Sequence, residues 1–322
     1  MRAAIFNEPG SVSVVQRPDA TVRDPTDAVV RVVSACVCGS DLWFYRGLTS
    51  RDPGPVGHEL IGVVEAVGAQ VTTLRRGDLV ICPFAYSDGT CPHCLHGIHT
   101  ACVNGGYLPD GNGDGGQGEA VRIPWADGTL VKVPGGGHSA ETLASLLTLS
   151  DVMGTGYHAA VCAQVKPGDS VAVVGDGAVG LCAVLSARLL GAERIIMLSR
   201  HHKRQELALA FGATDIVQER GEQAVSRVLE LTAGIGVDAA LECVGTGESI
   251  QTAIGIARPF SVVGYVGVPH GVEFPVRAMF RANKGVLGGP APVRQYLPAL
   301  LDEVLTSEPH TAEQWSERRG GL

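Results

Sequence analysis

Long hydrophobic runs are missing from this chain of 322 residues. The apolar start MRAAIF is broken by Asn7, Glu8 and Pro9, so it lacks the hydrophobic core of a secretory signal. No later run is long enough to span a bilayer. These absences lead us to expect a cytoplasmic protein without a membrane partner.

An excess of positive charge is missing as well. The chain has 25 Lys and Arg against 33 Asp and Glu, and its formal net charge of -8 argues against nucleic acid as the main partner. Hydrophobic residues at 45% and charged residues at 18% exclude a disordered chain. The length exceeds what one hydrophobic core comfortably serves, which favours two domains.

The sequence divides into two parts with different residue patterns. The first 150 residues carry short β-rich runs, such as 28–33 and 61–67, separated by Gly and Pro turns, which indicates a mainly antiparallel, barrel-like domain. The glycine-rich stretch 109–119 is expected to be a loop. From Val171 onward, short apolar strands alternate with helical stretches at 178–190 and 202–211. This alternation predicts a doubly wound parallel sheet.

A glycine loop, GDGAVG at 175–180, follows the apolar strand 171–174 and opens the first of these helices. Gly175 permits the tight turn, Gly177 allows close approach of a pyrophosphate, and Gly180 lets the helix pack close to the sheet. Ala178 and Val179 begin the helix, whose N-terminus favours phosphate. The alternative is an ordinary turn between strand and helix, but the context favours a dinucleotide site.

The end of the next strand selects the dinucleotide. An NAD-dependent enzyme usually places a carboxylate there, whereas this chain has Ser199 and Arg200, with Arg204 nearby. A guanidinium can bind a 2′-phosphate with paired hydrogen bonds, which favours NADP(H) over NAD(H). The alternative is that these cations form only the solvated first turn of a helix.

Cysteine, histidine and carboxylate side chains supply metal ligands at two places. The first set has the ligand types of an open catalytic zinc site; it comprises Cys38, His58, Glu59 and Asp151. The second lies within 88–102, where clustered cysteines point to metal rather than to disulfides; it comprises Asp88, Cys91, Cys94 and Cys102. His93, His96 and His99 offer substitute ligands for the second set, and a metal-free loop with reduced thiols is the alternative.

The pieces CGSD at 38–41, GHE at 57–59, the cysteine cluster, Asp151 and GDGAVG come in the order found in the zinc-dependent medium-chain alcohol dehydrogenases, which this chain resembles from Met1 to about Leu305. The resemblance implies a GroES-like catalytic domain over 1–150, completed by about 289–322, and a Rossmann domain over 151–288. It also implies an active site in the cleft between the two domains and a homodimer or homotetramer.

The resemblance assigns roles to individual residues. Cys38, His58 and Asp151 are implied as the catalytic zinc ligands, with Glu59 able to join or leave the ligand shell. One thiolate and one carboxylate balance the charge of Zn²⁺, so a permanently bound Glu59 would blunt its action on an alcohol. Taken singly, the three ligands could be a buried structural cysteine, a loop histidine and a helix-capping aspartate.

Ser40 stands where the family uses a hydroxyl to pass the substrate proton. The family often continues this relay through a histidine five residues after the cysteine, but Trp43 occupies that place here. Trp43, Tyr45, Phe84 and Tyr86 either line the substrate pocket or belong to the ordinary core. Val266, Gly267 and Val268 are implied to lie beside the nicotinamide ring.

The C-terminal sequence departs from the family pattern. After the stretch ending at Thr311 it does not match the further helix and strand that usually return to the catalytic domain, and we expect a polar, mobile tail. The function expected is a zinc-dependent hydride transfer between an alcohol, or an aldehyde or ketone, and NADP(H). The alternatives are a polyol, sugar or biosynthetic-intermediate dehydrogenase of the same superfamily, or a non-catalytic NADP(H)-binding protein.

Overall fold

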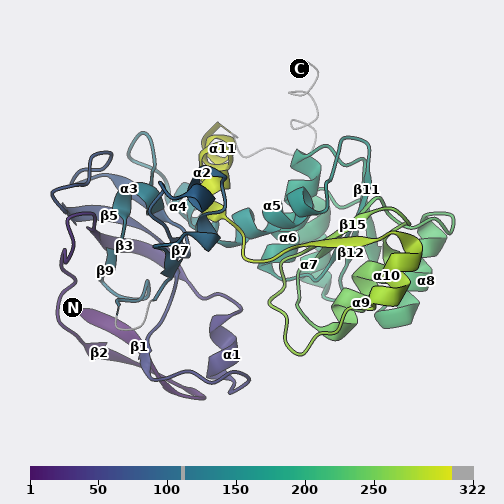
Figure 1. Ribbon diagram of the computed structural model, residues 1–322, viewed down its shortest axis with the longest axis horizontal. Helices are drawn as coiled ribbons and strands as arrows, with labels where there is room; N and C mark the ends of the chain where they lie inside the picture. The colour runs from purple at the N-terminus through teal and green to yellow at the C-terminus, as the bar shows by residue number, and fades with distance from the viewer. Residues whose placement is uncertain (110–112, 307–322) are drawn as a thin grey trace. The chain divides into compact units, whose positions relative to one another are not determined.

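The computed structural model describes residues 1–109 and 113–306 (Figure 1). The chain forms two compact units, one of Met1–Asp151 with Pro292–Thr306 and one that includes Val152–Ala291. The expected loop at 109–119 includes residues outside the described ranges, and the expected tail beyond Thr311 lies outside them altogether.

Antiparallel strands build the first unit. A five-stranded sheet has the order β10-β6-β5-β3-β9, and a three-stranded sheet has the order β2-β1-β4. A third pair joins β7 to β8. The strands are β1 (Arg2–Glu8), β2 (Ser11–Gln16), β3 (Ala28–Cys36), β4 (Gly54–Pro55), β5 (Glu59–Val67), β6 (Leu79–Cys82), β7 (Ala85–Tyr86), β8 (Gly106–Tyr107), β9 (Ala120–Ile123) and β10 (Val131–Lys132).

Apolar side chains on the five-stranded sheet form the core of this unit. Val30 of β3, Leu60 and Val64 of β5, Val80 of β6 and Ile123 of β9 are fully or almost fully buried in one cluster. Every second residue of β9 is buried, as expected for a sheet with one covered face. This core therefore fixes the register that brings the chain segments after β3 and before β5 together.

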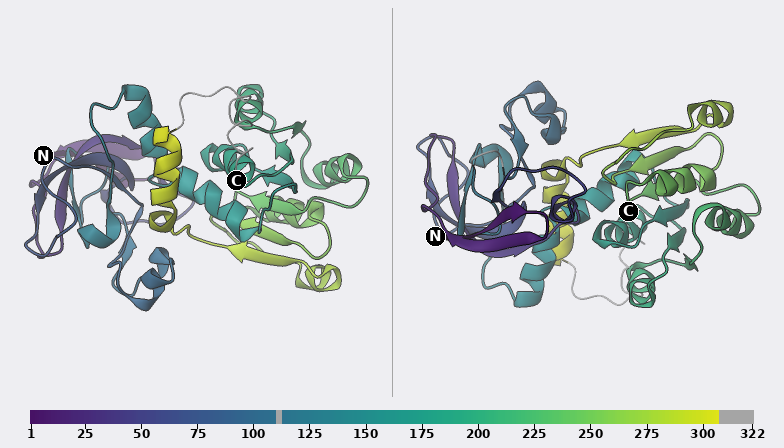
Figure 2. Two further views of the ribbon diagram at one scale, coloured as in Figure 1. Left: turned by 90° about the horizontal axis from the view of Figure 1, so that it is seen from above. Right: turned by 90° about the horizontal axis from the view of Figure 1, so that it is seen from below.

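Short helices and one returning helix complete the first unit. The helix α11 comes from the far end of the described chain and contacts α4, β10 and the 3₁₀ helix η1 (Figure 2). The helices are α1 (Asp41–Tyr45), α2 (Pro92–Leu95), η1 (His99–Ala101), α3 (Ala126–Thr129), α4 (Ala140–Thr148) and α11 (Val293–Thr306).

The second unit contains a six-stranded parallel sheet with the order β13-β12-β11-β14-β15-β16. The strand order reverses between β11 and β14, which is where doubly wound sheets bind ligands beyond their carboxyl ends. The strands are β11 (Ser170–Val174), β12 (Arg194–Leu198), β13 (Asp215–Val217), β14 (Ala239–Glu242), β15 (Val262–Tyr265) and β16 (Gly285–Gly288).

Two buried clusters show how helices cover both faces of this sheet. Val171 and Val173 of β11 belong to one cluster with residues of α5 and α6. Ala172 and Val174 belong to the other with residues of α8 and α9, as the alternation of side chains along a strand requires. The helices are α5 (Val152–Cys162), α6 (Ala178–Leu189), α7 (His202–Phe211), α8 (Gly221–Leu231), α9 (Gly247–Ile256) and α10 (Val276–Ala282). The predicted fold class, an antiparallel domain joined to a doubly wound one, is confirmed.

Candidate metal centres and cofactor site

The first metal cluster draws its residues from three separate segments. Cys38 lies between β3 and α1, His58 directly precedes β5 and Glu59 is its first residue, and Asp151 lies between α4 and α5. One ligand atom from each of the four lies within 4.8 Å of the others. The structure therefore brings together all four residues that the sequence singled out for a catalytic metal.

The spacing of the donor atoms suits a zinc ion. Cys38 Sγ lies 3.7 Å from Asp151 Oδ2, and His58 Nε2 lies 3.5 Å from the same oxygen. Two ligands of a tetrahedral zinc, each ~2.0–2.3 Å from the ion, lie roughly 3.3–3.8 Å apart. Sulfur, imidazole nitrogen and carboxylate oxygen are also the donor types that zinc prefers.

Asp41 orients two of these ligands, and the sequence reasoning did not single it out. Its Oδ2 accepts a hydrogen bond from the backbone N–H of Cys38 at 3.0 Å, and its Oδ1 lies 3.6 Å from Nδ1 of His58. A carboxylate on the far nitrogen of a ligating histidine fixes the ring so that the other nitrogen faces the metal. The signal was present in the sequence, since Asp41 ends the motif CGSD.

The surroundings of the Glu59 carboxylate indicate that this cluster suits a cation. Its side chain is buried, with 1% exposure. Within the described residues, Oε1 has no hydrogen-bond partner, while Oε2 accepts a hydrogen bond from the Cys36 thiol at 2.7 Å. A buried carboxylate oxygen without a partner is costly. A bound cation would remove that cost, so the residues present fit a metal.

The close packing of charged groups in this cluster shifts the pKa values of His58 and Cys38. Burial disfavours the charged form of His58, but hydrogen bonds to Asp151 and Cys38 outweigh it and raise the pKa of His58 to about 11. Burial also raises the pKa of the Cys38 thiol, and the charge of Asp151 adds to this effect, while hydrogen bonds with His58 and Ser40 oppose it. Without a metal, the cluster therefore holds protons that a metal would displace.

Ser40 and Phe84 flank this cluster. Ser40 precedes α1, yet its side chain does not cap the helix, and its hydrogen bond acts on Cys38 instead. The ring of Phe84 meets the imidazole of His58 edge-on, with 6.4 Å between centroids, and stacks on Tyr107. Tyr45 is 39% exposed, so it is not a fully packed core residue.

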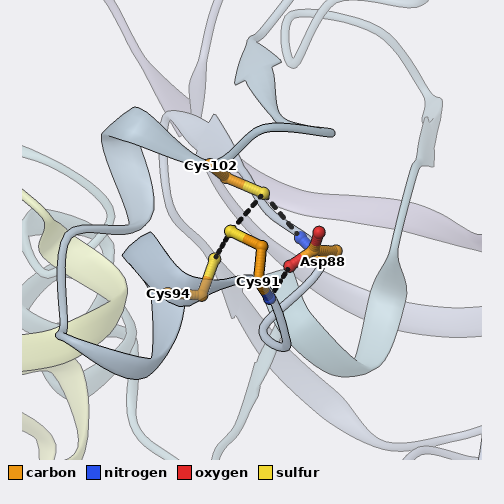
Figure 3. A group of neighbouring side chains, drawn as sticks. All are labelled: Asp88, Cys91, Cys94 and Cys102. Carbon is orange, nitrogen blue, oxygen red and sulfur yellow. Dashed lines mark hydrogen bonds between the residues drawn. The ribbon is translucent and has the colours of Figure 1, made fainter.

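The second metal cluster lies in the loop between β7 and β8 (Figure 3). Cys91 Sγ lies 3.6 Å from Cys94 Sγ and 3.8 Å from Cys102 Sγ, and the backbone N–H of Asp88 donates to Cys102 Sγ at 3.3 Å. One ligand atom from each of these four residues lies within 4.8 Å of the others. The set is the one expected from the sequence, with Asp88 in the first position.

Asp88 also organises the loop that carries the three cysteines. Its Oδ1 accepts the backbone N–H groups of Thr90 at 2.8 Å and Cys91 at 2.9 Å, and its Oδ2 accepts from Asn104 at 2.7 Å. Burial favours the neutral acid, but these hydrogen bonds outweigh it and hold the pKa of Asp88 well below its usual range. Asp88 is therefore an anion and can serve as a metal ligand.

The three nearby histidines do not belong to this ligand group. His96 Nδ1 lies 2.7 Å from the carbonyl oxygen of Pro92, and His99 Nδ1 lies 3.3 Å from that of Gly97. The substitution of a histidine for Asp88 that the sequence left open is therefore not favoured.

The glycine loop has the backbone conformation and close packing expected of a dinucleotide site. Gly175 follows β11 with φ of +110°, a conformation that side chains disfavour. A Cβ on Gly180 would clash with the carbonyl oxygen of Gly175, so the helix α6 packs closely against the strand. Space around Gly177 is open, which leaves the backbone accessible at the N-terminus of α6.

Asp176, the second residue of this loop, engages two of the three residues expected to select the cofactor. Its Oδ2 accepts a hydrogen bond from the Ser199 hydroxyl at 2.8 Å, and its Oδ1 forms an ion pair with Arg204 at 2.9 Å. Burial opposes ionisation, but these two contacts outweigh it and lower the pKa of Asp176. Arg200 is exposed and makes no ion pair within the described residues.

The segment 266–268 lies at the carboxyl end of β15. The backbone N–H of Val266 donates to the carbonyl oxygen of Glu242, the last residue of β14. A Cβ on Gly267 would clash with the backbone of Gly245. Val266, Gly267 and Val268 thus belong to the same edge of the sheet as the glycine loop, where a doubly wound fold binds its ligand.

Comparison with known proteins decides the family. The alcohol dehydrogenase GroES-like domain matches residues 24–135, and the zinc-binding dehydrogenase domain matches residues 178–306. A zinc-type alcohol dehydrogenase B of Aspergillus flavus is 35% identical over 321 residues, covering 96% of this chain and 73% of that protein. This chain belongs to the zinc-dependent medium-chain alcohol dehydrogenase family.

Other members of the zinc-dependent medium-chain alcohol dehydrogenase family agree with this assignment. A probable zinc-binding alcohol dehydrogenase of Mycobacterium tuberculosis is 37% identical over 281 residues, covering 87% of this chain and 71% of that protein. The solved alcohol dehydrogenase TADH from Thermus sp. ATN1 superimposes with a TM-score of 0.86 at 35% identity, covering 95% of this chain and 89% of that one.

As a member of this family, the protein is an oxidoreductase of small molecules that uses Zn²⁺ and a nicotinamide cofactor. The predicted family, fold class and enzyme class are thereby confirmed. No helix in the two described ranges is long and apolar enough to cross a membrane.

Proposed function

We propose that the protein transfers a hydride between an alcohol, or an aldehyde or ketone, and NADP(H), with Zn²⁺ held by Cys38, His58 and Asp151. The observation that carries this proposal is the group of one sulfur, one nitrogen and two buried carboxylates within 4.8 Å of one another. Such a group leaves one of four positions for substrate if Glu59 stays out of the ligand shell.

Bound zinc would supply a Lewis acid that favours the ionised alcohol and polarises a carbonyl. The protein's own residues set its strength. One thiolate and one carboxylate balance the double charge of zinc, and a fourth, anionic ligand would weaken the metal's attraction for substrate oxygen. Asp41 keeps the imidazole of His58 turned toward the ion.

Ser40 is proposed to carry the proton that an alcohol loses on oxidation. Its hydroxyl is not used as a helix cap and acts on Cys38, so it lies next to a member of the ligand group. Trp43 follows where the family often has a histidine, and an indole N–H can donate a hydrogen bond but cannot accept one, so it cannot relay a proton. The proton therefore leaves from Ser40 by another polar group or by water.

The cofactor is proposed to bind along the carboxyl edge of the parallel sheet. The backbone at Gly175, Gly177, Ala178, Val179 and Gly180 would hold the pyrophosphate at the N-terminus of α6, and the segment 266–268 would lie beside the nicotinamide. NADP(H) is preferred because β12 is followed by Ser199 and Arg200 rather than by a carboxylate. Asp176 opposes this preference, because it already pairs with Ser199 and Arg204.

The second cluster is proposed as a structural zinc site with Asp88, Cys91, Cys94 and Cys102 as ligands. We also propose that the protein assembles as a homodimer or homotetramer. In support of assembly, β16 forms one edge of the six-stranded sheet, and Leu287 on that strand is 52% exposed; such edges readily pair with another chain.

One experiment tests the proposal: metal content, binding of NADPH and NADH, and turnover of a panel of alcohols and aldehydes on one freshly purified sample. We expect two zinc ions per chain, tighter binding of NADPH than of NADH, and turnover. In Cys38→Ala we expect one zinc ion fewer, no turnover, and unchanged NADPH binding.

Other outcomes select the alternatives. Turnover confined to polyols, sugars or another specialised substrate would keep the hydride transfer and change the substrate class. A protein that binds NADPH without catalytic zinc and without turnover would contradict the proposed function and leave a cofactor-binding protein.

A further inference from the structure

We propose that Cys36 is a positioning residue for the metal site: its thiol holds one oxygen of Glu59 and thereby keeps that carboxylate from closing on the metal. The inference rests on the proposed zinc site of Cys38, His58 and Asp151. It concerns a cysteine that is neither a member of the ligand group nor part of the proton relay.

Strand pairing places the two side chains together. Cys36 is the last residue of β3 and Glu59 is the first residue of β5, and they are directly opposite each other in the antiparallel register. Side chains of directly opposed residues lie on the same face of a sheet, within reach of each other. The contact is therefore built into the sheet rather than into a loose loop.

The backbone on both sides of the contact is held as well. Gln117 Nε2 donates to the carbonyl oxygen of Cys36 at 3.2 Å, and the backbone N–H of Gln117 donates to the carbonyl oxygen of Val56 at 3.1 Å. One residue thus links the end of β3 to the segment that leads into His58 and Glu59. Neither side of the contact can shift freely relative to the other.

The two oxygens of Glu59 have different surroundings. Oε2 accepts the Cys36 thiol at 2.7 Å, whereas Oε1 is buried without a hydrogen-bond partner in the described residues and lies 4.0 Å from His58 Nε2. Oε1 therefore faces the ligand group. The thiol anchors the far oxygen and prevents the carboxylate from swinging forward to offer both oxygens to the ion.

Removal of the thiol changes what the buried carboxylate can do. Oε2 would then lack a donor. A buried carboxylate without hydrogen bonds is stabilised by contact with the nearest cation. Glu59 would close on the zinc, which strengthens metal binding and fills the position that the substrate needs. If Cys36 only helped the sheet to pack, its removal would not both tighten zinc binding and block the position that the substrate needs.

The test compares Cys36→Ala and Cys36→Val, which remove the donor, with Cys36→Ser, which keeps one. Zinc affinity is measured by competition with a chelator, and Cys38→Ala identifies the zinc that belongs to this site. Imidazole binding to the Co²⁺-substituted proteins, followed by the visible spectrum, reports whether the open position is free. We expect zinc to bind about tenfold more tightly and imidazole about tenfold more weakly in the Ala and Val variants. The Ser variant should match the parent.

Two controls separate this effect from general disturbance of the sheet. Cys82→Ala makes the same change at a buried cysteine of the neighbouring strand β6 and should leave both affinities unchanged. Glu59→Gln should abolish the effect of Cys36→Ala, because the two residues act as a pair.

Three outcomes overturn the inference. It fails if Ser and Ala variants behave alike, if zinc binds more weakly without the thiol, or if the effect persists in Glu59→Gln. In each of these cases the proposed function stands as long as Cys38→Ala removes one zinc. If Cys38→Ala leaves the zinc content unchanged, the proposed zinc site itself is wrong, and the inference falls with it.

Discussion

At the scale of single residues, we expect Asp176 to set the balance between the two nicotinamide cofactors. Its carboxylate pairs with Ser199 and Arg204, so a 2′-phosphate must compete with it for both partners. We expect Asp176→Asn, which keeps the shape and removes the charge, to tighten NADPH binding by about tenfold, or ~1.4 kcal/mol, and to change NADH binding much less. Fluorescence titration with each cofactor measures both affinities.

Arg200→Gln is the matched control for this prediction. Because Arg200 is exposed and unpaired in the described chain, its loss should weaken NADPH binding by about five- to tenfold and leave NADH binding nearly unchanged. Equal losses for both cofactors would mean that these cations do not read the 2′-phosphate, and the preference for NADP(H) would be wrong.

We expect zinc binding at the proposed catalytic site to depend on pH through His58. Its pKa of about 11 in the metal-free fold exceeds the ordinary value of 6.5, so the protonated ring stabilises the metal-free protein. That stabilisation is complete below about pH 6.5 and is lost as the pH rises through about 11. Zinc must displace this proton and that of the Cys38 thiol, whose pKa is also raised.

Zinc affinity at this site should therefore rise by roughly 10- to 100-fold per pH unit between pH 6 and 8, as one or two protons are released per ion. Chelator competition at several pH values, taken as the difference between the parent and Cys38→Ala, measures it. An affinity that stays flat over this range would show that the ligands are already deprotonated in the metal-free protein.

The sequence predicts the candidate metal ligands but not the residues that orient them. Cys38, His58 and Asp151 could be predicted because zinc restricts its ligands to a few residue types. Cys36 could not, because its contact with Glu59 depends on which strand pairs with which, and a side chain two places from a motif carries no sign of its partner. Asp41 and Asp176 both stand inside a quoted motif, but the sequence alone does not show which side chains they contact.

At the scale of elements, we expect the loop from Asp88 to Asn104 to depend on one carboxylate for both metal binding and shape. Asp88→Ala removes a ligand and leaves the N–H groups of Thr90 and Cys91 without their acceptor. We expect loss of about one zinc ion per chain and destabilisation by about 1–3 kcal/mol. Metal analysis and thermal unfolding measure the two effects.

Asp88→Cys separates the two roles of this carboxylate. A thiolate can complete a four-cysteine zinc site, so zinc should be retained and should resist chelators better, although the backbone acceptors are lost. A full complement of zinc in Asp88→Ala would instead show that the three cysteines suffice, and Asp88 would be only a loop-capping residue.

The elements themselves were predicted unevenly. The helix expected at 202–211 agrees with α7, because this stretch is rich in helix-favouring residues and ends at Gly212, whose φ is +115°. The short pieces α1 to α3 and η1 carry no such signal. They form because the surrounding sheet and the ligand residues hold the backbone there, which a single sequence does not reveal.

At the scale of the whole molecule, metal and cofactor should stabilise different units. Both ligand groups lie in the unit of Met1–Asp151, and the described part of the other unit contains no such group. Removal of zinc should therefore increase hydrogen exchange in β3, β5 and the 88–104 loop, and leave β11 and β12 nearly unchanged.

Bound NADPH should instead slow hydrogen exchange in the unit that includes Val152–Ala291. At 100 times its Kd, a ligand that binds only the folded protein contributes about 2.7 kcal/mol, and this should appear as slower exchange in β11, β12 and α6. Exchange measured with chelator, with NADPH and with both distinguishes the units. If chelation accelerates exchange equally in both, the two units unfold as one, and metal ligands in the first unit then stabilise the cofactor-binding sheet as much as their own.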